Sequence, residues 1–255
     1  MNAVTFHPLL VFGFSLIVLW LAAQIGVSFH RSPRSVDEGD HEDFAIILTA
    51  TLTLLGLIVG FTFSMAVNRY EQRKNYEEGE ANAIGTEWVR ADMLPADDAA
   101  KVRSQLRNYL DQRILFYVTP DEAKLEEINA RTARLQADLW SSVQAPATAH
   151  PTPVVALAVA GMNDVLNAQG YTQAAFWNRI PLAAWGLMVG IAICCNVLFG
   201  FGSHSKKRGA KRLLILPLIV SIAFMLIADI DTPRHGLIEV KPQNLLGLAE
   251  SLRGH

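Results

Sequence analysis

The chain has 255 residues, of which 51% are hydrophobic and 18% are charged, and its formal net charge is −2. Soluble domains carry about 25% charged residues, so this composition disfavours a soluble enzyme, a disordered chain and a disulfide-rich secreted module. The small net charge gives no support to a nucleic-acid partner. Because the apolar residues gather in four blocks of roughly membrane-spanning length, the sequence predicts a polytopic protein embedded in a lipid bilayer.

The four apolar blocks are predicted to cross the bilayer as helices. The first block lacks the basic residues that open a secretory signal and is too long for one, so we expect it to be retained as an anchor. No block contains Lys, Arg, Asp or Glu within its core, which argues against a proton pump or an ion-coupled carrier. The blocks cover residues 8–29, 44–67, 180–201 and 213–228.

A charged region between the second and third blocks is predicted to be helical throughout. Residues 68–93 continue the second membrane helix until Pro95 breaks it. Residues 96–118 have the periodicity of an amphipathic helix with one apolar face. That face carries Val102, Leu106, Leu110, Ile114 and Tyr117.

The next helix is predicted from a start signal. Thr119 is expected to be its N-cap, Pro120 its first residue and Glu122 the acidic member of a capping box. Its inner face is expected to carry Leu125, Ile128, Leu135 and Leu139.

Shorter elements complete the predicted chain. Residues 145–153 predict a linker, and residues 154–168 predict a core or interfacial helix that is too short to span the bilayer. The apolar alternation at Ile238 and Val240 predicts a short extended piece. Residues 245–252 then predict a small amphipathic helix.

Together these elements predict an all-α polytopic membrane protein, with four transmembrane helices and a helical extramembrane domain inserted between the second and third spans. The predicted divisions are residues 1–67 with transmembrane helices 1 and 2, residues 68–178 with the helical domain, residues 179–230 with transmembrane helices 3 and 4, and residues 231–255 as a short C-terminal tail.

Small side chains form one stripe along the second apolar block, and two interpretations of it stay open. The stripe consists of Thr49, Thr53, Gly56, Gly60 and Ser64. In one interpretation, Gly56, Gly60 and Ser64 let helices approach closely, within one subunit or between subunits. In the other, this helix lines a pore, and Thr53, Leu57 and Phe61 form an apolar neck, which gates by dewetting without charged residues.

Arg69 and Arg73 lie one helical turn apart, just beyond the second block. They could raise the local anion concentration at a vestibule of the pore. Alternatively, they are ordinary interfacial anchors with Glu71 and Glu77 as partners on the same helix.

Two acidic groups and a cysteine pair have structural explanations. Asp229 and Asp231 fit a turn cap bridged to Arg234 better than a cation site. The run from His41 to Asp43 fits a solvated helix start, where acidic residues are favourable. Cys194 and Cys195 are adjacent inside an apolar block and are expected to pack as small apolar residues.

The sequence carries no nucleotide-binding loop, nucleophile elbow or Cys/His metal spacing. We therefore expect no catalytic residues, no cofactor and no metal site, and an enzyme is not supported.

Several segments resemble the bestrophin family. The run 59–70, VGFTFSMAVNRY, is similar to the end of the bestrophin pore helix, where Gly-Phe is followed by an apolar stretch, a polar residue, Arg and an aromatic residue. Residues 80–84, EANAI, and the tail Asp231-x-Pro233-Arg-x-Gly236-x-Ile238-x-Val240 are closer to a bacterial group described as bestrophin-like, of unassigned function. The layout of two spans, a helical insert and two spans extends the resemblance over nearly the whole chain.

This resemblance implies a homopentameric anion channel, with a chloride-like permeating ion and a multi-pass location in the bacterial inner membrane. It implies that the second membrane helix lines a hydrophobic neck, with Thr53, Leu57 and Phe61 at the neck positions. Two departures stand out, since Thr53 replaces a bulky apolar residue and Glu71 replaces the second aromatic residue after Arg69. No dense acidic C-terminal cluster is present, so calcium gating is not implied.

Orientation and function each keep an alternative. Four spans would place both termini and the helical domain on one side, which is cytoplasmic according to the resemblance. The basic short loop at residues 206–212 favours the opposite orientation. The alternative to an oligomeric ion channel is a non-conducting membrane scaffold or sensor whose helical domain binds a partner.

Overall fold

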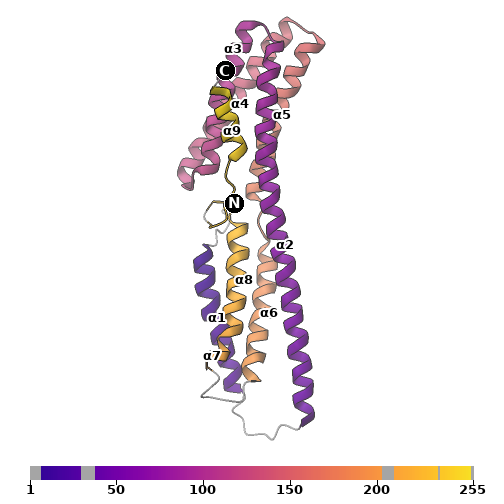
Figure 1. Cartoon of the computed structure of the whole chain (residues 1–255), viewed down its shortest axis with the longest axis vertical. Coiled ribbons are helices and arrows are strands. Elements are labelled where there is room, and N and C mark those ends of the chain that lie inside the picture. Colours follow the sequence, from indigo (N-terminus) through magenta and orange to yellow (C-terminus); the bar gives the residue numbers. More distant parts are fainter. Residues whose placement is uncertain (1–6, 30–37, 203–209, 235, 254–255) are drawn as a thin grey trace. The chain divides into compact units, whose positions relative to one another are not determined.

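The computed structural model describes residues 7–29, 38–202, 210–234 and 236–253. Within these ranges the regular structure is helical and contains no strand, which confirms the all-α prediction (Figure 1). The elements in chain order are α1 (Pro8–Phe29), α2 (Glu38–Arg90), η1 (Ala91–Met93), α3 (Ala96–Val118), α4 (Glu122–Ala149), α5 (Pro153–Trp177), α6 (Leu182–Phe201), α7 (Ala210–Leu213), α8 (Ile215–Asp231) and α9 (Gln243–Arg253).

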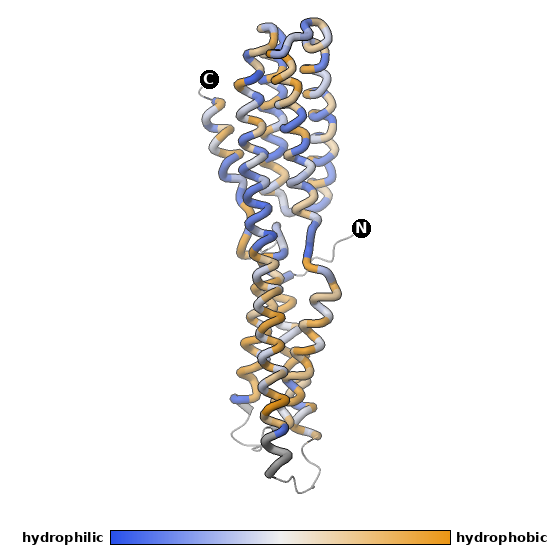
Figure 2. The backbone as a smooth tube through the Cα atoms, turned by 90° about the vertical axis from the view of Figure 1, so that its right-hand side faces the viewer, coloured by the Kyte–Doolittle hydropathy of each residue, from blue (hydrophilic) through white to orange (hydrophobic). Residues whose placement is uncertain are grey.

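The chain divides into two compact units, and α2 contributes to both. The first unit comprises Met1–Asn68 and Arg179–Ile238, and the second comprises Arg69–Asn178 and Glu239–His255. Apolar residues dominate α1, α6, α8 and the first half of α2, whereas hydrophilic residues alternate with apolar ones along α3, α4 and α5 (Figure 2). The segment predicted as one C-terminal tail, residues 231–255, is therefore shared between the two units.

In the first unit, α1 packs against both α6 and α8. The contact between α1 and α6 is close because each helix presents a glycine to the other. A Cβ atom on Gly26 would lie 2.9 Å from the backbone nitrogen of Phe201, and one on Gly200 would lie 3.1 Å from the Cα atom of Ala23. Small residues of this kind let membrane helices approach until their backbones touch.

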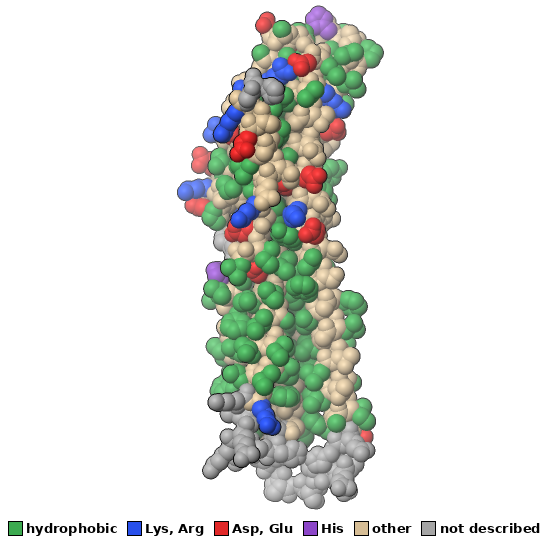
Figure 3. Space-filling model, viewed as in Figure 1, with side chains coloured by type: hydrophobic (Ala, Val, Ile, Leu, Met, Phe, Trp, Pro, Cys, Tyr) green, Lys and Arg blue, Asp and Glu red, His purple; other side chains and the backbone are tan. Residues whose placement is uncertain are grey.

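Within the described ranges, three helical stretches are long and apolar enough to cross a membrane: Pro8–Phe29, Asp43–Met93 and Pro153–Phe201. In α2 the apolar part is residues 44–67, which we call the spanning segment. Helix α8 has 17 residues, about 25 Å at 1.5 Å per residue, so the fourth span stays a prediction. Hydrophobic side chains are frequent on the visible face of the first unit, and charged side chains are scattered over the second (Figure 3).

The second unit has an apolar core to which α2, η1, α3, α4, α5 and α9 contribute. Helix α3 has the predicted bounds. The predicted inner faces of α3 and α4 are confirmed, since all nine side chains are buried or partly buried in this core. Buried are Val102, Leu106, Leu110, Tyr117, Leu125 and Leu139, and partly buried are Ile114, Ile128 and Leu135.

The predicted start of α4 is wrong by two residues. Asp121 is the N-cap, and its carboxylate accepts hydrogen bonds from the amides of Ala123, at 3.0 Å, and Lys124, at 3.4 Å. Thr119 instead ends α3, because its amide donates to the carbonyl of Leu115. Thr119 and Asp121 are both residue types that cap helices. Because α3 extends to Val118, Thr119 lies at the end of α3, and Asp121 caps α4.

The predicted linker at residues 145–153 is also mostly wrong. Pro146 lies inside α4, where it lacks an amide hydrogen, but its carbonyl accepts a hydrogen bond from His150, so the helix continues to Ala149. Helix α5 is longer than the predicted 154–168, because Thr152 caps it at the start and it continues to Trp177. At the C-terminus α9 is confirmed, while the predicted extended piece around Ile238 forms no strand within the described residues.

Candidate pore-lining helix and its support

The spanning segment of α2 has one buried stripe and a broad exposed face. The stripe consists of Leu55, Thr62 and Ala66, which are 4%, 3% and 0% exposed. At about 100° per residue, Thr53, Leu57 and Phe61 lie between about 120° and 160° around the helix from that stripe. Leu57 is 53% exposed and Phe61 66% exposed. The three residues predicted to form a neck therefore share a face that points away from the rest of the first unit.

The predicted packing residues Gly56, Gly60 and Ser64 are exposed too. Among the described residues nothing lies within 4 Å of a Cβ atom placed on Gly56 or Gly60. Close packing at these glycines within one chain is thus not observed, in contrast to Gly26 and Gly200. Packing between copies of the chain stays a prediction.

The hydroxyl groups of Thr51, Thr53 and Thr62 in the spanning segment are bonded to carbonyls of their own helix. Thr53 donates to the carbonyl of Thr49 at 2.8 Å, and Thr62 donates to the carbonyl of Ile58 at 2.8 Å. This i−4 bond is common for threonine in helices. Because the hydroxyl proton of Thr53 is engaged, the oxygen presents lone pairs to its surroundings and no hydrogen-bond donor.

Arg69 and Arg73, the predicted vestibule residues, lie in different environments. Arg69 is half-buried. Arg73 is fully buried, and its guanidinium donates to the carbonyls of Ala175 and Asn178, each at 3.2 Å. A cation is favourable at the carbonyl end of a helix, so Arg73 is explained as a C-terminal cap of α5. The vestibule role of Arg69 stays a prediction.

Glu77, predicted as a partner on the surface of its own helix, is buried and caps α9 instead. Its carboxylate accepts hydrogen bonds from the side-chain amide of Asn244 at 2.6 Å and from the backbone amide of Leu245 at 2.9 Å. This joins residues far apart in the sequence and anchors the C-terminal helix to α2.

Replacement of Glu77 by Ala should release α9. The first turn of α9 would lose the acceptor for one backbone amide and one side-chain amide, a change that costs about 1–2 kcal/mol at a helix N-terminus. We expect faster amide hydrogen exchange across residues 243–253, with little change in α4. The exposed neighbour Glu78 serves as the matched control, since Glu78→Ala removes a carboxylate from the same helix without touching α9. Equal exchange in both variants would contradict the capping role.

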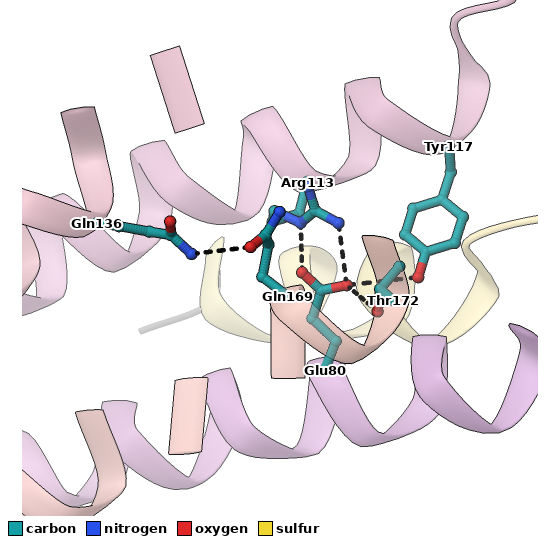
Figure 4. Close-up of polar contacts among 6 residues, drawn as sticks. All are labelled: Glu80, Arg113, Tyr117, Gln136, Gln169 and Thr172. Carbon is teal, nitrogen blue, oxygen red and sulfur yellow. Dashed lines mark hydrogen bonds and ion pairs between the residues drawn. The ribbon is translucent and has the colours of Figure 1, made fainter. Parts of the chain in front are cut away.

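A buried ion pair links α2 to α3 (Figure 4). Glu80 and Arg113 are both fully buried and form a direct salt bridge. The Glu80 carboxylate also accepts hydrogen bonds from Thr172 of α5 at 3.1 Å and from Tyr117 at 3.4 Å. The guanidinium lies over the ring of Phe116, with its central carbon 4.4 Å from the ring centre. The Glu80 carboxylate of α2 therefore links α2 to both α3 and α5.

Sequence reasoning missed this group, although a signal for it exists. Arg73, Glu77, Glu80, Ile84 and Glu87 follow one another at spacings of four, three, four and three residues, and all five are buried. This is the spacing of an inward-facing helix stripe. Because four of the five side chains are charged, an analysis of apolar periodicity assigns the stripe to the solvent face.

The carboxylates at the end of α8 bind backbone amides. Asp229 accepts hydrogen bonds from Leu237 at 2.7 Å and Ile238 at 3.0 Å, as expected for a turn cap. Asp231 accepts from the amide of Ile180 at 3.1 Å. Both carboxylates therefore fix the backbone of segments that lie next to the end of α8. The basic residues 206–208, on which the charge argument for orientation depends, lie outside the described residues.

Comparisons with known proteins give a consistent assignment of the fold. A family model described as bestrophin-like domain matches residues 11–245. Three solved structures of a bacterial bestrophin homologue from Klebsiella pneumoniae, each carrying one substitution, are similar to this chain. The first has a TM-score of 0.67 at 13% identity and covers 98% of this chain and 100% of that chain. The second has a TM-score of 0.66 at 14% identity, with coverages of 95% and 98%. The third has a TM-score of 0.64 at 14% identity, with coverages of 93% and 98%.

The comparison with curated proteins found no match. The structural neighbours share the fold over nearly their full length, and their low identity leaves the individual pore positions to be argued from this chain.

Proposed function

Because the chain belongs to the bestrophin-like family over residues 11–245, we propose that its copies assemble into an ion channel whose pore is lined by the spanning segment of α2. One observation carries the proposal. In the most apolar 18 residues of α2 only 6% are buried, whereas 28% are buried in the corresponding window of Pro8–Phe29. A membrane helix that its own chain leaves almost uncovered is available to neighbouring copies and to a central pore.

The two stripes on the exposed face fit this arrangement together. Gly56, Gly60 and Ser64 lie about 60° around the helix from the centre of the face formed by Thr53, Leu57 and Phe61. In a ring of copies, the small residues let neighbouring α2 helices approach closely. The larger residues then face the axis, where an apolar neck gates by dewetting. The stoichiometry expected from the family resemblance is a pentamer.

The proposed ion preference is for anions such as chloride. Aromatic rings carry a positive edge, so edges of Phe61 around the axis favour an anion weakly. Arg69, near the end of the spanning segment, attracts anions to the entrance. Thr53 favours cations instead. Its hydroxyl proton is donated to the carbonyl of Thr49, so the oxygen presents lone pairs, which attract cations. The preference therefore depends on Phe61 and Arg69.

Current recordings across a salt gradient test both conduction and ion preference. Purified protein reconstituted into planar bilayers should conduct, and under a potassium chloride gradient the reversal potential should lie toward the chloride equilibrium potential. Arg69→Gln should move it toward zero. A reversal potential toward the potassium equilibrium potential would refute the anion preference but would still support the proposal of an ion channel. Absence of current from correctly assembled protein would refute the channel and favour the scaffold or sensor alternative.

The proposed location is the bacterial inner membrane, with the second unit in the cytoplasm. Single cysteines at exposed positions of the second unit, labelled with a membrane-impermeant reagent from each side of the membrane, measure this directly. Labelling from the periplasmic side would favour the opposite orientation, which the short basic loop indicates.

A further inference from the structure

One buried carboxyl group in the second unit accepts no hydrogen bond from the part of the chain that the structure describes. Glu87 is 0% exposed, and both of its carboxylate oxygens are buried without a hydrogen-bond partner among the described residues. The other buried carboxylates of α2 differ, since Glu77 and Glu80 each accept hydrogen bonds. A buried polar group without partners costs free energy, and an unpaired buried charge costs far more.

The group lies where α2 meets α5, over a glycine. A Cβ atom on Gly161 of α5 would collide with Glu87 Oε2 and would lie 2.6 Å from Nη1 of Arg90. Glycine at this position thus makes room for two side chains of α2. The Arg90 guanidinium also reaches Asp164 of α5, with Nη1 and Oδ2 3.8 Å apart.

The charges around Glu87 come from several elements. Arg90 lies on α2 itself and Asp164 on α5, and these two act on Glu87 electrostatically. Arg103 of α3 lies over the ring of Trp88, the residue that follows Glu87, and forms a salt bridge with Asp92 of η1. Arg103 is therefore engaged by another carboxylate, and Arg90 is shared with Asp164, so neither is dedicated to Glu87.

Burial raises the pKa of the Glu87 carboxyl from 4.5 to about 8, against the opposing effect of Arg90 and with a smaller contribution from Asp164 in the same direction. The neutral acid is then the form that the packed structure accommodates near neutral pH. Above a pH of about 8 the proton leaves for bulk water, and the carboxylate that remains accepts no hydrogen bond from the described residues.

We infer that Glu87 is a proton-binding site that closes the contact between α2 and α5: the neutral carboxyl packs over Gly161, and loss of its proton opens this contact to water. The site lies in the second unit, and neither its chemistry nor its test requires ion conduction. The ligand is the proton itself, and the contact responds to pH between the ordinary pKa of the carboxyl group and its raised value of about 8.

The sign of the pH dependence follows from linkage. Since the pKa is raised in the closed contact, the closed state binds more protons than the open state between about pH 4.5 and pH 8. The stability of the contact is complete below this window, falls as the pH rises through it, and is constant above it.

Infrared difference spectroscopy detects the proton directly. The full-length protein in lipid nanodiscs should show a protonated-carboxyl C=O band that disappears with a midpoint near pH 8. This band should be absent from Glu87→Gln and present in Glu78→Gln, which changes an exposed carboxyl on the same helix. A band that persists in Glu87→Gln, or that titrates near the ordinary pKa of glutamic acid, would overturn the inference.

Hydrogen–deuterium exchange measures the opening. After correction for the chemical exchange rate, exchange around Gly161 in wild type should rise about tenfold per pH unit up to about pH 8 and then level off. Glu87→Gln, which stays neutral, should exchange slowly at every pH, and Glu78→Gln should behave like wild type. A pH-dependent rise of equal size in Glu87→Gln would show that the contact does not respond to this proton.

Discussion

Phe61→Ala is expected to raise single-channel conductance about tenfold. Phe61 is 66% exposed and lies about 120° around α2 from the buried stripe, so removal of its ring from each copy would widen the proposed neck. A wider and less apolar neck stays hydrated more easily, which lowers the barrier to ion passage. A reduction of about 1.4 kcal/mol in that barrier corresponds to a tenfold higher flux.

Phe63→Ala is the matched control for this prediction. Phe63 has the same side chain two positions further along and is 41% exposed. At about 100° per residue it points to nearly the opposite side of the helix from Phe61. Single-channel recordings of both variants, with Leu57→Ala as a second neck variant, decide the matter. Similar conductance in wild type and Phe61→Ala, or an equal increase in Phe63→Ala, would refute the proposal that the spanning segment of α2 lines the pore.

The second large effect is expected from the ion pair between Glu80 and Arg113. Both side chains are fully buried, so removal of one partner leaves an uncompensated buried charge. Glu80→Ala should destabilise the protein by about 3–5 kcal/mol, which corresponds to a fall in apparent Tm of about 10 °C. Thermal unfolding followed by circular dichroism in detergent measures this shift.

Replacement of both partners tests the cause of that loss. Glu80→Met combined with Arg113→Leu removes both charges and fills the space with apolar atoms, so we expect most of the stability to return. Glu78→Ala is the control for loss of a carboxylate from the exposed side of α2 and should leave the Tm nearly unchanged. If the double variant is as unstable as Glu80→Ala, the shape of the site, and not its charge balance, sets the stability.

Local signals predicted much of the helix pattern. Apolar periodicity placed α3 at its observed bounds and identified its buried face, because residues at i, i+3 and i+4 share one side of a helix. The continuation of α2 beyond residue 67 was also predictable, since no Pro or turn cluster interrupts it before Pro95. Helix ends were predicted less well. Thr119 and Asp121 compete as caps, and the helix continues past Pro146, where a break was expected.

The buried charged stripe of α2 could not be predicted from apolar periodicity. Glu80 is buried because Arg113, Tyr117 and Thr172, from two other helices, converge on it. Nothing near residue 80 in the sequence indicates those partners. The burial of Glu87 depends in the same way on a glycine on another helix, 74 residues further along.

The sequence by itself determined that this chain is helical, apolar in membrane-length blocks and related in layout to a known membrane family, because hydropathy and helix periodicity are local properties. Only the tertiary structure decided which polar side chains are inside, since the burial of a charge depends on partners contributed by distant helices. It also separated the buried stripe of α2, at Leu55 and Thr62, from the exposed face at Leu57 and Phe61. All four residues lie in one apolar run, and their burial depends on what the rest of the fold covers.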